Sequence, residues 1–313
     1  MRLSEIVAKR GIDAFRFDDF LFVGKQLSQD PSRLILVGGQ AIETWGHVFH
    51  VLPPTGDHAP LTEDTDFFGS KKDAQWLCNL LGKDSTELIL AKDFDPSANT
   101  AMAYILTSDG RILLIDFLKT LIGLDNEIIK ATAVPIDVAG VRLNVLHPLL
   151  CLKSRLSNLE HLSVKRNTNG VMQAHWSIDI VGAWLRRLVK EKATQKDLIK
   201  ACHGVVEAAE YKSGPHCYRE YGIDPLRAVG DEVIAAIGGR FVTEDWPRRT
   251  TRVAIKRVAM MTRYSFNAMD RRSAISADNL KLAAFDSEGG KVSTYPTANQ
   301  NDPAGSASDP TKR

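Results

Sequence analysis

The sequence predicts an α+β protein, in which a mixed sheet flanked by helices is followed by an all-helical C-terminal domain. Two observations favour this class. Short apolar segments separated by turn residues fill the first half of the chain, as strands do. After His147 and Pro148 the apolar positions recur at a helical spacing. We therefore expect an N-terminal helical segment at 1–30, a core at 31–146, a helical domain at 147–285 and a disordered tail at 286–313.

The elements of the expected core follow from local signals. Asp109-Gly110 and Ala139-Gly140 are turn signals between strands. The prolines and the glycine of His50–Pro60 predict a loop, and Lys71–Leu81 has the apolar period of a helix. The remaining expected elements are strands at Leu34–Val37 and Thr62–Phe68 with a helix at Gln40–Phe49 between them, strands at Glu87–Ala91, Ala101–Thr107 and Arg111–Leu118, and the strand pair Ala133–Val138 and Val141–Leu146.

The second half of the chain is expected to be helical throughout. The expected helices are Leu149–Leu162, His175–Val189, Asp197–Tyr211 and Pro225–Ile237. The polar stretch Arg166–Gly170 is expected to be a loop between the first two.

Composition and the N-terminus exclude several classes of protein. No run approaches the ~18 consecutive apolar residues of a membrane span. The N-terminus is charged and lacks the apolar core of a secretion signal, so we expect a cytoplasmic protein without a membrane partner. The cysteines have no CxxC spacing, and Cys78, Cys151 and Cys202 lie in apolar-periodic stretches, where buried free thiols are expected.

Three aspartates are the candidate metal ligands. Asp64 and Asp66 are one residue apart on a predicted strand, so their side chains point to the same face. Asp116 is the only acid in the apolar strand Ile112–Leu118, where a buried carboxylate needs a partner. If the two strands are neighbours, the three carboxylates form a site for one or two Mg²⁺ (or Mn²⁺) ions, because like charges at that range need a cation between them.

Gly38 and Gly39 complete the pattern at the end of the strand Leu34–Val37. Glycines let backbone N–H groups approach an anion, and the helix that follows favours negative charge at its start. A strand–glycine–helix turn alone is usually only a tight connection. Together with the three acids, it indicates a metal-bound nucleoside triphosphate.

On these residues the chain resembles the nucleotidyltransferase superfamily that includes DNA polymerase β. The segment from Gly38-Gly39 to Trp45-Gly46, followed by Asp64 and Asp66, resembles the AbiEii toxin-like branch in particular, as does Val145–Lys153. The resemblance covers roughly 33–190 and implies a nucleotidyltransferase-like mixed sheet followed by helices. One departure is the 25-position separation of Gly39 and Asp64, which is longer than in the family and places the excess in His50–Pro60.

The resemblance implies a role for each site residue. Asp64 and Asp66 bind the metal that carries the triphosphate, and Asp116 completes the second metal site or accepts the proton of the attacking hydroxyl. Lys153 neutralises phosphate charge, or is an ordinary solvated lysine. Asp179 orients Lys153 or a substrate group, or is an ordinary helix charge. Thr62 and Thr65 hold the loop or hydrogen-bond phosphate, alongside the N–H groups of Gly38 and Gly39.

The predicted reaction moves a nucleoside monophosphate from an NTP to a hydroxyl acceptor. Three hypotheses stay open: a toxin-like enzyme acting on RNA (for example tRNA) or protein, with a cognate antitoxin; an antibiotic-type small-molecule nucleotidyltransferase; and a non-catalytic nucleotide-binding module. Arg240–Arg272 carries nine Lys/Arg against three acids. Arg248, Arg252 and Lys256 share one helical face there, either a nucleic-acid surface or a solvated one.

Overall fold

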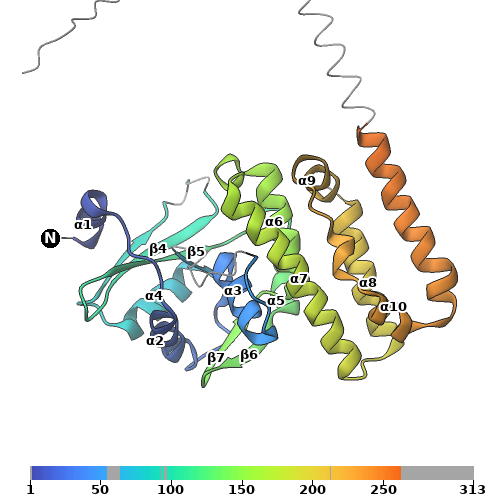
Figure 1. Cartoon of the computed structure of the whole chain (residues 1–313). Coiled ribbons are helices and arrows are strands. Elements are labelled where there is room, and N and C mark those ends of the chain that lie inside the picture. The colour runs from blue at the N-terminus through green and yellow to red at the C-terminus, as the bar shows by residue number, and fades with distance from the viewer. Residues whose placement is uncertain (1, 55–63, 93, 95–96, 212, 262–313) are drawn as a thin grey trace, which may run out of the picture. The chain divides into compact units, whose positions relative to one another are not determined.

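The computed structural model describes residues 2–54, 64–92, 94, 97–211 and 213–261. These residues belong to one compact unit, Met1–Met261. The predicted tail at 286–313, Thr62 and most of the His50–Pro60 loop lie outside the described residues. In the described part, a sheet with flanking helices precedes a series of helices, shown in green to orange in Figure 1, so the predicted α+β class is confirmed.

The sheet has seven strands in the order β3-β4-β5-β2-β1-β7-β6. The pairs β1–β7 and β2–β5 are parallel and the others are antiparallel, as predicted for a mixed sheet. The strands are β1 (Ile35–Val37), β2 (Thr65–Phe68), β3 (Thr86–Leu90), β4 (Asn99–Leu106), β5 (Ile112–Leu118), β6 (Val134–Val138) and β7 (Val141–Val145).

Side-chain alternation on β2 and β5 separates the apolar core from the acids. Phe67 and Phe117 are register partners, are fully buried, and stack with ring centroids 6.3 Å apart. The intervening positions Asp66 and Asp116 therefore point to the other face, where both are only half-buried. The apolar face fixes the register, and the register places the two acids side by side.

The helices of the first half pack on the sheet or join it to the second half. α4 begins with a capping box between Ser70 and Asp73 and packs against β3 and β4. α3 follows β1 directly and packs against β1, β2 and the later helices α6 and α7. The helices are α1 (Leu3–Arg10), α2 (Phe17–Leu27), α3 (Gly38–Phe49), α4 (Lys71–Leu81) and α5 (Asn126–Thr132).

The second half is helical, with a helix at Ser213–Tyr221 that was not expected and with boundaries that differ from the expected ones. Asn167 caps the next helix through its side chain, so the expected loop to Gly170 ends at residue 167. Gly230 interrupts the helix expected at Pro225–Ile237, leaving a 3₁₀ turn at Pro225–Ala228 before α10. The elements are α6 (Pro148–His161), a 3₁₀ turn at Ser163–Lys165, α7 (Thr168–Lys190), α8 (Gln195–Glu210), α9 (Ser213–Tyr221), α10 (Asp231–Ile237), a π turn at Phe241–Asp245 and a helix over 246–261.

Two large apolar clusters stabilise the unit and meet at α6. Leu150 and Cys151 of α6 belong to the cluster beneath the sheet, and Leu152 and Leu156 belong to the cluster among α6–α10. A helix shared by both cores is held on two sides, which makes it a rigid support for side chains on its third side. The division at residue 147 stays a prediction.

Two expectations about composition can be compared with the structure. Cys78, Cys151 and Cys202 are buried free thiols, as predicted, and Cys217 is one as well. No helix in the described ranges combines the length and the apolar character needed to cross a membrane.

Candidate active site

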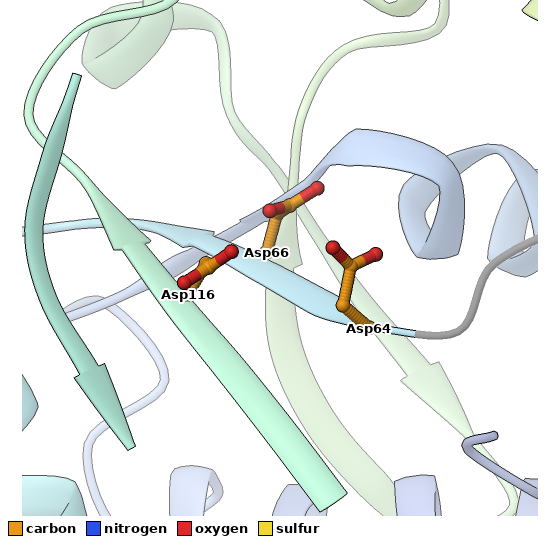
Figure 2. A group of neighbouring side chains, drawn as sticks. All are labelled: Asp64, Asp66 and Asp116. Atoms are coloured by element: carbon orange, nitrogen blue, oxygen red, sulfur yellow. The ribbon is translucent and has the colours of Figure 1, made fainter. Parts of the chain in front are cut away.

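Three carboxylates gather where β2 and β5 lie side by side (Figure 2). Asp66 and Asp116 are register partners across the parallel pair, and Asp64 lies just before β2, which begins at Thr65. One oxygen from each carboxylate lies within 4.8 Å of an oxygen from each of the others. The prediction that the three acids converge is thus confirmed, and their all-oxygen donor set is the kind that Mg²⁺ binds.

Gly38 brings the start of α3 against Asp66. Its φ of +69° is in the left-handed region, and a Cβ placed there would lie 1.9 Å from Oδ2 of Asp66. Val37, the N-cap residue, has no side-chain oxygen to cap the first turn of α3. The start of α3, which has no side-chain N-cap, therefore lies beside the acid cluster, with Gly38 and Gly39 lining the same cavity as Asp64, Asp66 and Asp116.

This cavity has a volume of about 540 Å³ and lies between the sheet and α6–α7. The helical wall carries Arg155 on α6 and Gln173 on α7, with Lys165 on the turn between them. Arg155 is 8% exposed and Gln173 is 7% exposed, and Nη1 of Arg155 donates to Oε1 of Gln173 at 2.8 Å. Cations on one wall therefore face carboxylates on the other.

Burial and mutual repulsion shift the protonation of the acids. Burial, together with the neighbouring charges of Asp64 and Asp116, raises the pKa of Asp66 to about 7, although Arg155 and Lys165 oppose the shift. Burial, with Asp64, likewise raises the pKa of Asp116 to about 6 against the effect of Lys165. Both values show that the cations do not fully compensate the acids, and a divalent cation would do so.

Asn99 is a partner of Asp116 that the sequence analysis did not identify. Its Nδ2 donates to Oδ1 of Asp116 at 3.1 Å. β4 begins at Asn99 rather than at Ala101, and the strand register shifts between these two residues. The irregularity lets a strand-end amide reach the carboxylate from the antiparallel neighbour. A strand predicted to start at Ala101 leaves out this contact.

The other predicted site residues in the described ranges do not line the cavity of the carboxylates. Nζ of Lys153 pairs with Oε2 of Glu207 at 2.9 Å, and Lys153 lines a separate cavity of about 130 Å³. Asp179 is exposed on α7, where its charge acts on His175. Thr65 is 1% exposed and lies on the opposite face of β2 from Asp66. The functional roles of these three residues stay predictions.

The helical wall contains polar residues that sequence reasoning passed over. Ser154, Arg155 and Asn158 line the cavity at positions i, i+1 and i+4 of α6. Ser154 and Arg155 are buried, although they are polar residues in a helix whose apolar residues pack into two cores. Leucines on two sides of α6, with Ser, Arg and Asn on the third, are a signal that could have identified this wall.

Comparisons with known proteins yielded distant structural similarities. No family model matches the chain, and no curated protein matches it. One similar solved structure is an antigenic nucleotidyltransferase-like protein from Paracoccidioides brasiliensis, with TM-score 0.35 and 14% identity, covering 59% of this chain and 92% of that one. Another is the Megavirus polyadenylate synthase, with TM-score 0.33 and 12% identity, covering 66% of this chain and 47% of that one.

At these scores neither protein's activity is transferred to this chain. The chain spans about half the length of the polyadenylate synthase. The resemblance to the AbiEii toxin-like branch stays a prediction. The residues of the cavity themselves therefore carry the functional proposal.

Proposed function

We propose that the protein is a metal-dependent nucleotidyltransferase that moves a nucleoside monophosphate from an NTP to a hydroxyl acceptor. The observation that carries the proposal is the cluster of Asp64, Asp66 and Asp116 beside the start of α3 in one cavity. A non-catalytic binding module has no need to hold three repelling carboxylates together. The raised pKa values of Asp66 and Asp116 indicate a site that is electrostatically incomplete without a cation.

The residues present fit Mg²⁺ or Mn²⁺. Asp64, Asp66 and Asp116 would hold the ion or ions, with oxygen ligands close enough to be shared. When bound, the metal neutralises phosphate charge and polarises the attacking and leaving oxygens. The side chains of the chain do the remaining work, which is binding, orientation and proton transfer.

In the proposed reaction an acceptor hydroxyl oxygen bonds to the α-phosphorus while the bond to the β-phosphate oxygen breaks. Asp116 accepts the hydroxyl proton, and pyrophosphate leaves with the bond electrons. A carboxylate within reach of the attacking hydroxyl can accept its proton. Asn99 orients Asp116 through its hydrogen bond, and the N–H groups at Gly38 and Gly39 face the phosphates.

For the acceptor, we infer a hydroxyl on RNA or protein in the cytoplasm, as in a toxin-like enzyme with a cognate antitoxin. A small-molecule acceptor of the antibiotic type is the alternative. The motif resemblance of Gly38–Gly46 and Val145–Lys153 supports the first, and the same cavity serves both. The two differ in the size of the labelled product.

The test is incubation with α-labelled NTPs, Mg²⁺ and a cell extract, followed by separation of RNA, protein and small molecules. We expect label in a macromolecular fraction with the wild type and a loss of roughly 100-fold or more with Asp64→Ala plus Asp66→Ala. Lys130→Met is the control, since Lys130 is exposed and pairs with Glu127 on α5. Label in no fraction, or label unchanged in the double variant, contradicts the proposal. Label only in small molecules favours the alternative acceptor.

A further inference from the structure

We propose that Arg155, oriented by Gln173, is the anchor for the pyrophosphate portion of the donor. Together with Lys165 it forms an anion subsite on the helical wall of the cavity, opposite the metal-binding carboxylates. The identity of the ligand rests on the proposed function. The affinity for pyrophosphate does not depend on catalysis, so the two can be tested separately.

The first step is the unused hydrogen-bonding capacity of Arg155. A guanidinium carries five N–H donors in a planar fork. Gln173 accepts from Nη1, while the buried Nε has no hydrogen-bond partner in the described part of the chain. Buried polar groups are normally satisfied, and one that is not indicates a missing partner. Because Arg155 lines the cavity, that partner fits there.

The second step is charge. Burial lowers the pKa of Arg155, while Asp66, and more weakly Asp64, raise it. The hydrogen bond of Arg155 within the described ranges goes to the neutral Gln173, so the charges of the acids act on it from across the cavity. A buried charge without a contact partner is costly, and a bound anion removes that cost.

The third step is the shape and the position of the ligand. A planar fork matches two phosphate oxygens at once, which an ammonium group does not. Lys165 is an exposed second cation that lines the same cavity and acts on Asp66 and Asp116. A polyphosphate that reaches from the carboxylate-bound metal to Arg155 touches both walls. The α-phosphate then lies nearest the acids and the terminal phosphates nearest α6.

The competing explanation is that Arg155 only balances the charge of Asp66 within the fold. That role predicts a loss of stability on substitution but no change in anion affinity. To remove the acids from the comparison, we choose Asp64→Asn plus Asp66→Asn as the background. This double variant removes two of the three carboxylates that would hold a metal and leaves the cationic wall in place.

The experiment measures binding of inorganic pyrophosphate to the full chain by calorimetry in EDTA. The background variant is expected to bind, and adding Arg155→Met is expected to weaken binding roughly 10- to 100-fold. Arg155→Lys, which keeps the charge and loses the fork, is expected to weaken it by a smaller factor. Adding Arg240→Met is the matched control, because Arg240 is exposed and pairs with Glu244 far from the cavity residues in sequence.

A melting curve is measured for each variant, so that a folding defect is recognised. If Arg155→Met does not fold, the affinity of Arg155→Lys is compared with that of the background variant instead. Absence of binding in the background, or equal affinity with and without Arg155, overturns the inference. Pyrophosphate binding that depends on Arg155 in a chain that transfers no nucleotide leaves the inference standing and sinks the proposed function. If the chain transfers nucleotide but its affinity for pyrophosphate does not depend on Arg155, the proposed function stands and the inference is overturned.

Discussion

Two sets of basic side chains differ in what compensates them. On the helical wall of the cavity, Arg155 and Lys165 face the acids across space, without an ion pair among the described residues. On the helix over 246–261, Arg252 and Lys256 both contact Glu210 of α8. Arg248 on the same helix pairs with Asp245.

The acids that face these two sets of cations have pKa values shifted in opposite directions. Burial raises the pKa of Asp66 to about 7 even though two cations oppose it. Burial also acts on Glu210, but the hydrogen bonds from Lys256 and Arg252 bring its pKa below the ordinary value. A charge in contact is already neutralised, while a charge held apart remains available to a ligand. Counting Lys and Arg along the sequence cannot distinguish the two.

The largest expected effect comes from Asp66. Because the folded state binds a proton at Asp66 more tightly than the unfolded state, the stability of the metal-free protein falls as pH rises from about 4 to about 7, and changes little above it. The full shift corresponds to about 4 kcal/mol. We expect the melting temperature in EDTA to fall from pH 5 to pH 8 in the wild type, and to fall much less in Asp66→Asn.

Mg²⁺ should reverse this loss. At pH 8 the ion meets ionised carboxylates, so it should raise the melting temperature of the wild type more than at pH 5, where it competes with protons. Asp66→Asn should show little response to Mg²⁺ at either pH. Glu210→Gln is the control for a buried carboxylate that is already compensated, and its response to Mg²⁺ should equal that of the wild type. A pH-independent melting temperature in EDTA contradicts the contrast between the two regions.

The sequence was sufficient for the carboxylate side of the cavity because strands impose a simple period. Alternation on β2 and the lone acid of β5 identify Asp64, Asp66 and Asp116, and the parallel pairing of the two strands then brings them together. The turn at Gly38 follows directly from its glycine and the strand before it. These signals are local or depend on a single pairing.

The cationic side of the cavity could not be predicted without the tertiary structure. Lys153 and Arg155 are two residues apart on α6, and nothing in their spacing shows which faces the cavity. That depends on how α6 is rotated between two apolar cores, which the packing of α3, α7 and α8 determines. The contact from Asn99 likewise depends on a bulge that the hydrophobic pattern does not mark.

Gly38→Ala shows whether the acids need the open space beside Gly38. Gly38→Ala adds a Cβ that would lie 1.9 Å from Oδ2 of Asp66 at a positive φ, so the carboxylate must move. We expect a loss of stability of about 1–3 kcal/mol and at least about a tenfold loss of nucleotide transfer. Chemical denaturation and the labelling assay measure the two effects.

Gly110→Ala separates the backbone strain from the contact with Asp66. Gly110 also has a positive φ, of 80°, but a Cβ there meets nothing within 4 Å. It should therefore lose about 1 kcal/mol of stability and keep its transfer activity. Equal activity in the two variants would mean that displacing Asp66 does not matter for the reaction.

The smallest expected effect is at Glu210. Glu210→Gln releases Arg252 and Lys256 from their contact partner, so more positive charge becomes available to RNA. Fluorescence anisotropy with a labelled unstructured RNA should show an affinity about threefold above the wild type at low salt, and a steeper loss of binding as salt rises. Glu244→Gln is the control. Its partner Arg240 is 79% exposed, so the charge of Arg240 is largely hydrated even in the ion pair, and losing Glu244 should change RNA binding little. If Glu210→Gln keeps the affinity and the salt dependence of the wild type, contact with an acid does not withdraw these cations from RNA. Both interpretations of the basic segment, a nucleic-acid surface and a solvated one, would then stay open.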